Sequence, residues 1–191
     1  MITRDSIEIL LENSQKVFDV SDLARIWGYT DFVKVKNLAS YYKDKNKLFR
    51  VAQGIYSTTN KPDMFEVAQK LQTPSYITYH TALTFYGINF QFYSSIHCFS
   101  NRKREVKVFD QNIIYHQVKL DILFNSIGVE QKEHYNLASK ERAICDSLYI
   151  SPSIAFDNLK NFDRNKLLEI SQIYENKRVE REVQRIIKNG D

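Results

Sequence analysis

The chain has 191 residues, of which 43% are hydrophobic and 13% aromatic, a composition typical of a globular protein with a packed core. Its length accommodates one large domain or two small ones, and its net charge of +4 does not by itself indicate a nucleic-acid partner. No apolar run approaches the roughly 18 residues of a membrane span, and no signal peptide is evident. Cys98 and Cys145 lie far apart, so we expect a cytoplasmic protein without a disulfide framework or zinc site.

The first thirty residues predict two short helices with a strand between them. Asp5 can cap the first helix, and the segment 16–20 is rich in the residue types of strands. Ser21 is the expected N-cap of a second helix over 22–27. Gly28 ends that helix, because glycine adopts the left-handed conformation of a helix terminus at little cost.

A third helix is expected from a cap at Thr30 to about Lys45, with a buried stripe formed by Val35, Leu38, Ala39 and Tyr42. Strands over 48–51 and 55–58 are expected to form a hairpin directly after it. Three helices followed by a hairpin predict a winged helix-turn-helix, whose last helix can enter the DNA major groove. A winged helix that contacts only proteins is the alternative.

The third helix and the hairpin carry an excess of positive charge, with six cations against the single acid Asp44 between Lys34 and Arg50. Such a run is often only a solvated face, but a winged helix would present it to DNA. Amide side chains can pair with adenine, while cations reach guanine or phosphate. The residues expected to contact DNA are Lys34, Lys36, Asn37, Ser40, Tyr41, Lys43, Arg50 and Gln53.

The polar stretch around Pro62 predicts a domain boundary, which gives a winged helix-turn-helix domain over 1–60 and a mixed α+β domain over 61–191. The predicted fold class is therefore α+β. In the second domain, strands are expected over 94–101, 105–110 and 112–119, with a further strand pair around Gly128. Helices are expected over 64–72, after Thr78, over 140–150 behind the cap Ser139, and through the tail from 154 onwards.

His80, in the aromatic segment YITYHTALTFYGI, is the most conspicuous candidate for chemistry. It lies off the apolar stripe of its predicted helix, and no other His, Cys or acid follows at i+3 or i+4. A metal site needs several convergent ligands, and a general base needs a nucleophile and an orienting partner. We therefore expect His80 to be structural, and we expect no catalytic residue, metal or cofactor.

Glu105 and Lys107 form an E-x-K pair, which is half of the signature of a metal-dependent nuclease. Such a nuclease also needs an acid on a neighbouring strand, whereas the nearest upstream acids, Asp63 and Glu66, fall on a predicted helix. Charge alternation on an exposed strand is the expected explanation, and a nuclease is the enzyme alternative. Cys145 is expected to be a small buried hydrophobe.

The last predicted helix has a basic face. Three interpretations stay open for it: a solvated face, a second DNA contact, or a surface for a toxin or for the toxin's RNA substrate. The residues concerned are Lys177, Arg178, Arg181, Arg185 and Lys188.

Taken in order, these segments resemble the AbiEi antitoxin family. Its members look like a winged helix, then Y-I-s-x-x-s-A-L-x-x-x-G-I, a strand-rich stretch, and x-I-A-s-x-E-K-A-x-x-D-x-L-Y. This chain has Arg142 where Lys is usual and Leu137 where Ile is frequent, and the resemblance covers about residues 5 to 175. The matching positions are Tyr76, Ile77, Ala82, Leu83, Gly87, Ile88, Ala138, Ser139, Glu141, Ala143, Asp146, Leu148 and Tyr149.

The resemblance implies a bacterial type IV toxin–antitoxin or abortive-infection operon. The winged helix would bind inverted repeats in its own promoter, so the implied partner is double-stranded DNA. The rest of the chain would counter a nucleotidyltransferase toxin without forming a stable complex with it. The residues alone leave open a winged-helix regulator whose second domain is an unrelated sensor or protein-interaction domain.

Overall fold

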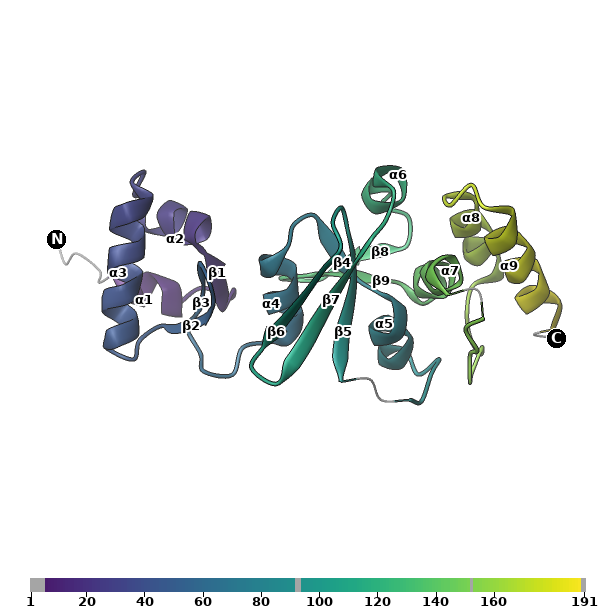
Figure 1. The fold of residues 1–191 in the computed structure, drawn as a ribbon, viewed down its shortest axis with the longest axis horizontal. Helices are drawn as coiled ribbons and strands as arrows, with labels where there is room; N and C mark the ends of the chain where they lie inside the picture. Colours follow the sequence, from purple (N-terminus) through teal and green to yellow (C-terminus); the bar gives the residue numbers. More distant parts are fainter. Residues whose placement is uncertain (1–5, 92–93, 152, 190–191) are drawn as a thin grey trace. The chain divides into compact units, whose positions relative to one another are not determined.

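The computed structural model describes residues 6–91, 94–151 and 153–189, and the chain divides into two compact units, Met1–Leu71 and Gln72–Asp191. Each unit contains helices and a sheet of its own (Figure 1), so the chain has the predicted α+β class. No helix within these described ranges is long and apolar enough to cross a membrane.

The first unit places its helices around a small antiparallel sheet of order β1-β3-β2. The predicted stripe of its longest helix is inside: Val35, Ala39 and Tyr42 are buried in the core with Phe18 and Leu23, and Leu38 packs against them. The elements are α1 (Ser6–Leu11), β1 (Val17–Asp19), α2 (Val20–Trp27), α3 (Phe32–Asp44), β2 (Phe49–Ala52), β3 (Ile55–Ser57) and α4 (Met64–Leu71).

The N-caps of α2 and α3 are aspartates rather than the predicted Ser21 and Thr30. Asp19 caps α2 by accepting the backbone N–H of Asp22 at 2.8 Å, and the Asp22 carboxylate accepts the N–H of Asp19 in return. Asp31 caps α3 by accepting the N–H of Val33 at 2.8 Å. A carboxylate also interacts favourably with the positive end of the helix dipole, which explains why aspartate caps in both places.

The helix α4 belongs to the first unit, so the boundary falls after Leu71 rather than after residue 60. The carboxylate of Glu66 is buried and accepts the backbone N–H groups of Lys16 and Val17, both at 3.0 Å. The ammonium group of Lys70 lies 2.6 Å from the Asp22 carboxylate. These contacts join residues about fifty positions apart, which local sequence patterns do not reveal.

The second unit is built on a six-stranded mixed sheet of order β6-β7-β5-β4-β9-β8, in which the pairs β5–β7 and β4–β9 are parallel. Helix α5 packs on β5 and against α7, and α8 and α9 pack against α7 (Figure 1). The elements are β4 (Ser75–Ile77), α5 (Tyr79–Phe85), β5 (Ser95–Ser100), β6 (Arg104–Val108), β7 (Gln111–Gln117), α6 (Leu120–Phe124), β8 (Val129–Gln131), β9 (Asn136–Ala138), α7 (Lys140–Ile150), α8 (Arg164–Gln172) and α9 (Lys177–Asn189).

Two segments of the second unit differ from the prediction. Helix α6, which was not predicted, forms because Ile122 and Leu123 are buried on one face of a short turn of helix. The start of the predicted helical tail, 154–162, is not helical. There the backbone N–H groups of Asp157 and Asn158 donate to the distant carbonyl of Ile88, at 3.1 and 2.9 Å, instead of to carbonyls one helical turn earlier.

Candidate nucleic-acid interface

Helix α3 presents its polar side chains to solvent because its apolar stripe is used by the core. Every residue of α3 that the sequence assigned to DNA contact is exposed, as are the two assigned residues of the hairpin. The surface therefore offers all eight side chains to a ligand: Lys34, Lys36, Asn37, Ser40, Tyr41, Lys43, Arg50 and Gln53.

A groove of about 580 Å³ separates α3 from the β2–β3 hairpin and brings four of these eight residues together. Lys36 and Ser40 line it from α3, while Arg50 and Gln53 line it from the hairpin. The side chains thus combine two cations with a hydroxyl and an amide, a donor set suited to phosphate oxygens. Val20, Ser21, Phe32, Gly54 and Tyr56 complete the lining.

The other four predicted residues lie on α3 outside the groove. Tyr41 is 55% exposed, and the Lys45 ammonium group lies 5.9 Å from the centroid of its ring. Lys43 is paired with Asp44 at 3.1 Å, which neutralises part of its charge. Lys34 and Asn37 are exposed on the face away from the core.

Three of the predicted cations, two in the groove and one outside it, keep their positive charge uncompensated. Within the described ranges, Lys34, Lys36 and Arg50 make no ion pair with an acidic side chain. An anionic ligand would therefore meet these charges without first displacing a protein carboxylate. Such an arrangement attracts a polyanion and makes its binding sensitive to salt.

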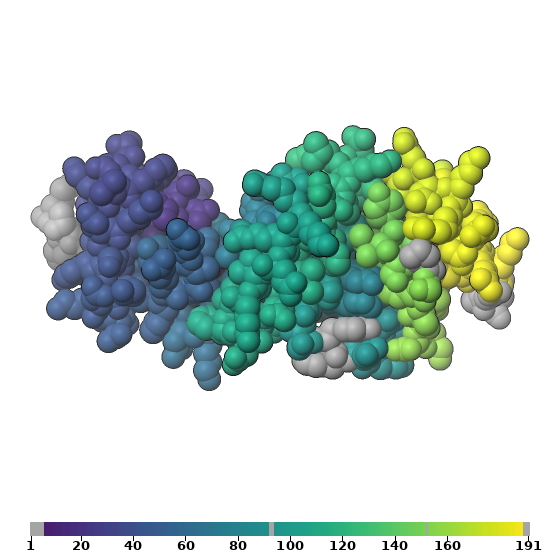
Figure 2. Space-filling view, in the orientation of Figure 1, coloured from purple at the N-terminus to yellow at the C-terminus, as the bar shows by residue number. Residues whose placement is uncertain are grey.

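The basic face predicted on α9 separates into residues with different roles. Arg178 is half-buried and donates from its guanidinium to the carbonyls of Leu148 and Tyr149, at 3.5 and 3.0 Å, so it caps the end of α7. Helix α9 lies at the surface of the second unit (yellow in Figure 2). Its Arg181 and Arg185 are exposed, and the Glu182 carboxylate lies 3.5 and 3.6 Å from them. The face is therefore less basic than the sequence suggested.

The sheet brings two further histidines to His80. His97 on β5 and His116 on β7 are 2.9 Å apart between ring nitrogens, and the His80 ring lies 5.4 Å from that of His97. Tyr79 packs edge-on against His97 and His116. Burial lowers the pKa of all three histidines, that of His97 to about 3 with a contribution from its neighbours. In the described part of the chain, no group of three or more His, Cys, Asp or Glu could hold a metal ion.

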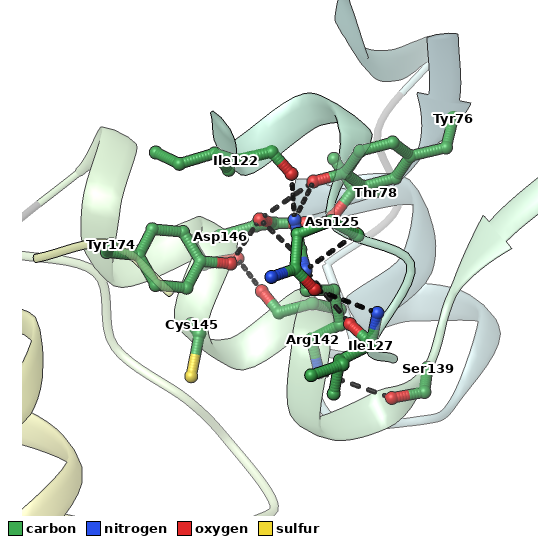
Figure 3. Close-up of polar contacts among 12 residues, drawn as sticks. Tyr76, Thr78, Ile122, Asn125, Ile127, Ser139, Arg142, Cys145, Asp146 and Tyr174 are labelled. Carbon is green, nitrogen blue, oxygen red and sulfur yellow. Dashed lines mark hydrogen bonds and ion pairs between the residues drawn. The ribbon is translucent and has the colours of Figure 1, made fainter. Parts of the chain in front are cut away.

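Two positions that carry the family resemblance, Tyr76 and Asp146, meet in a buried polar network centred on Asp146 (Figure 3). Its carboxylate accepts hydrogen bonds from the hydroxyls of Tyr76 at 3.1 Å, Thr78 at 2.6 Å and Tyr174, and from Arg142 Nε at 3.3 Å. All five side chains are at most 2% exposed. Burial raises the pKa of Asp146, and Arg142 and the hydroxyl donors oppose that rise.

Arg142 extends this network to the loop after α6. Its guanidinium donates to the carbonyls of Ile122 at 2.7 Å, Asn125 at 3.3 Å and Ile127 at 2.9 Å, and to the Tyr76 hydroxyl at 3.0 Å. Because the group is fully buried and its donors are used within the protein, the network holds the sheet, α7 and this loop together. Thr78, predicted to cap α5, gives its hydroxyl to Asp146 instead.

Glu105 and Lys107, the nuclease-like pair, are exposed on β6 at the edge of the sheet. Charged side chains on an edge strand oppose pairing with another chain, which is an ordinary structural use for them.

No protein-family model matches the chain, and a search of curated proteins found no match.

The sequence analysis did not predict that Val20, Ser21 and Phe32 would line the groove between α3 and the hairpin. The i, i+4 spacing of Phe32, Lys36 and Ser40 along α3 is the signal that could have found the α3 side of it.

Proposed function

We propose that the first unit is a winged helix that binds double-stranded DNA, and that the chain is a transcriptional regulator. The groove between α3 and the hairpin carries this proposal, since it gathers Lys36, Ser40, Arg50 and Gln53 from two elements. In the proposed complex α3 enters the major groove, and the sugar–phosphate backbone runs along the groove between helix and hairpin. No covalent step is required of the protein.

The double variant Lys36→Glu/Arg50→Glu tests the proposal, and its matched control is Arg181→Glu/Arg185→Glu, which makes the same change in net charge on exposed residues of the second unit. The DNA segment upstream of the coding sequence serves as the probe. We expect the groove variant to bind at least tenfold more weakly at 0.1 M salt. Each lost phosphate contact should also make the negative slope of log affinity against log salt less steep by about 0.9. Equal weakening by both variants would show non-specific attraction only.

We further propose, from the resemblance of motifs, that the regulator is an autorepressor and a type IV antitoxin that counters a nucleotidyltransferase toxin. The buried network supports this proposal, since it joins Tyr76 of the first resembling segment to Asp146 of the second. Co-expression with a nucleotidyltransferase encoded next to the gene is the test. Growth that is rescued by the full chain supports the antitoxin role. Repression of the promoter without rescue would leave a regulator whose second unit does something else.

A further inference from the structure

The first turn of α3 exposes apolar side chains beside the cations. Val33 is 65% exposed and Phe32 is 51% exposed, and Tyr29 precedes them with 43% of its surface exposed. An isolated exposed apolar residue needs no explanation, but these three are close in sequence at the start of the helix proposed to enter DNA. N-terminal residues of such helices are the ones that reach base edges.

Val33 and Asn37 share the middle of the exposed face of α3. Residues four apart lie one above the other on a helix, and 100° per residue places this pair opposite the buried Val35 and Ala39. Lys36 and Ser40 lie on the side of the groove, and Lys34 and Tyr41 lie on the other side. The pair is therefore flanked by residues suited to the two phosphate backbones.

The spacing of this pair suits neighbouring base pairs. Four residues of helix rise about 6 Å, which corresponds to roughly two base steps of duplex DNA. The nearest carboxylate on this turn, that of Asp31, is engaged in accepting the N–H groups of Val33 and Lys34. An amide pairs bidentately with adenine N6 and N7, and an aliphatic side chain packs on the thymine C5-methyl group.

Resting on the proposed function, we propose that Val33 and Asn37 determine specificity by reading A·T pairs within two base steps of each other in the major groove. Asn37 reads an adenine through its amide. Val33 covers the methyl group of a thymine and removes both apolar surfaces from water.

The test uses the full chain and a duplex enriched by it from a random-sequence pool. Each thymine in turn is replaced by deoxyuridine, which lacks only the C5-methyl group and pairs unchanged. We expect one or two positions at which this replacement weakens wild-type binding about fourfold, the effect of one buried methyl group. The Val33→Ala variant should bind the thymine and uracil duplexes equally. The matched control is Leu11→Ala, which truncates another exposed apolar residue, 51% exposed on α1, and should keep the wild-type preference.

Three results overturn this inference while leaving DNA binding intact: no position sensitive to uracil, sensitivity that persists in Val33→Ala, or enriched duplexes without paired A·T positions. Failure to bind any duplex, with no difference between wild type and Lys36→Glu/Arg50→Glu, overturns the proposed function as well. Val33 is exposed, so its truncation leaves the fold intact, and urea unfolding of the variant verifies this.

Discussion

Arg142 is the residue whose surroundings say most about the second unit. It lies in the middle of the motif that resembles the antitoxin family, at a position where that family usually has lysine. Its guanidinium donates to one carbonyl of α6 and two of the following loop, to the Tyr76 hydroxyl and to the Asp146 carboxylate. Although burial by itself lowers the pKa of Arg142, the Asp146 carboxylate raises it above its usual value, so the side chain stays charged. Arg142 therefore has a structural role: it holds α7 to β4, to α6 and to the loop after α6.

Replacing this arginine by lysine should therefore destabilise the second unit. Lysine keeps the charge but offers three donors at one nitrogen, so several of the carbonyls of Ile122, Asn125 and Ile127 lose their partner. We expect Arg142→Lys to lower the free energy of unfolding by about 2–4 kcal/mol, measured by urea denaturation. Arg181→Lys, on an exposed side chain, should change it by less than about 0.5 kcal/mol. Equal changes in the unfolding free energy of the two variants would show that the loop is held in place without the guanidinium donors of Arg142.

The three clustered histidines predict loss of stability in mild acid. Their pKa values are lower in the folded chain than in the unfolded one, so the unfolded chain takes up protons more readily as the pH falls. Stability is thus fully present above about pH 6.5 and declines below it, by at most about 1.4 kcal/mol per pH unit for each histidine. Urea unfolding between pH 7.5 and about 5 measures this. The unfolding free energy of His97→Gln should depend less steeply on pH than that of the wild type. Equal pH dependence in the two proteins would show that His97 does not contribute to the loss of stability in acid.

At the scale of elements, α9 shows that a charged helix can be structural on one side and solvated on the other. Val179 and Val183 are fully buried, and Arg178 caps α7. Deleting α9 would therefore remove part of the core, so truncation after Glu175 does not isolate the role of its cations. Substitution of single side chains isolates the role of these cations.

We expect Arg178→Ala to lower the free energy of unfolding by about 1–3 kcal/mol, because the carbonyls of Leu148 and Tyr149 lose a charged donor. By contrast, Arg181→Glu/Arg185→Glu should change stability by less than about 1 kcal/mol. It should also keep promoter affinity within about twofold, a limit set by weak, screened surface charges. Thermal or urea unfolding and a DNA-binding titration measure the two effects. A loss of affinity larger than that of Lys36→Glu/Arg50→Glu would instead make α9 a DNA contact.

At the scale of the whole molecule, the division after Leu71 predicts which fragment folds alone. Residues 1–71 retain α4, whose Glu66 and Lys70 bind Lys16, Val17 and Asp22. A fragment ending at residue 60 leaves the backbone N–H groups of Lys16 and Val17 without that carboxylate. We expect the longer fragment to unfold cooperatively and to be more stable by at least about 2 kcal/mol. Circular dichroism during thermal unfolding compares them, and equal midpoints would place α4 outside the folding unit.

The sequence by itself determined the local features of this protein. Periodicity located α3 and its stripe of Val35, Ala39 and Tyr42, and alternation located the strands β5 to β7. It also showed which cations α3 must leave in solvent, because a helix with one apolar stripe has only one face to bury. These are properties of residues within one or two turns of each other.

Only the tertiary structure decided which distant residues meet. In the folded chain, aspartates rather than the neighbouring hydroxyl residues cap α2 and α3, and Glu66 joins α4 to β1. The segment 154–162 is not helical, because its backbone N–H groups at Asp157 and Asn158 donate to the carbonyl of Ile88. The tertiary structure also formed the groove between α3 and the hairpin, and it surrounded Asp146 with partners up to 70 positions away. Such contacts depend on the packing of whole elements, and neither the spacing nor the type of a residue specifies them.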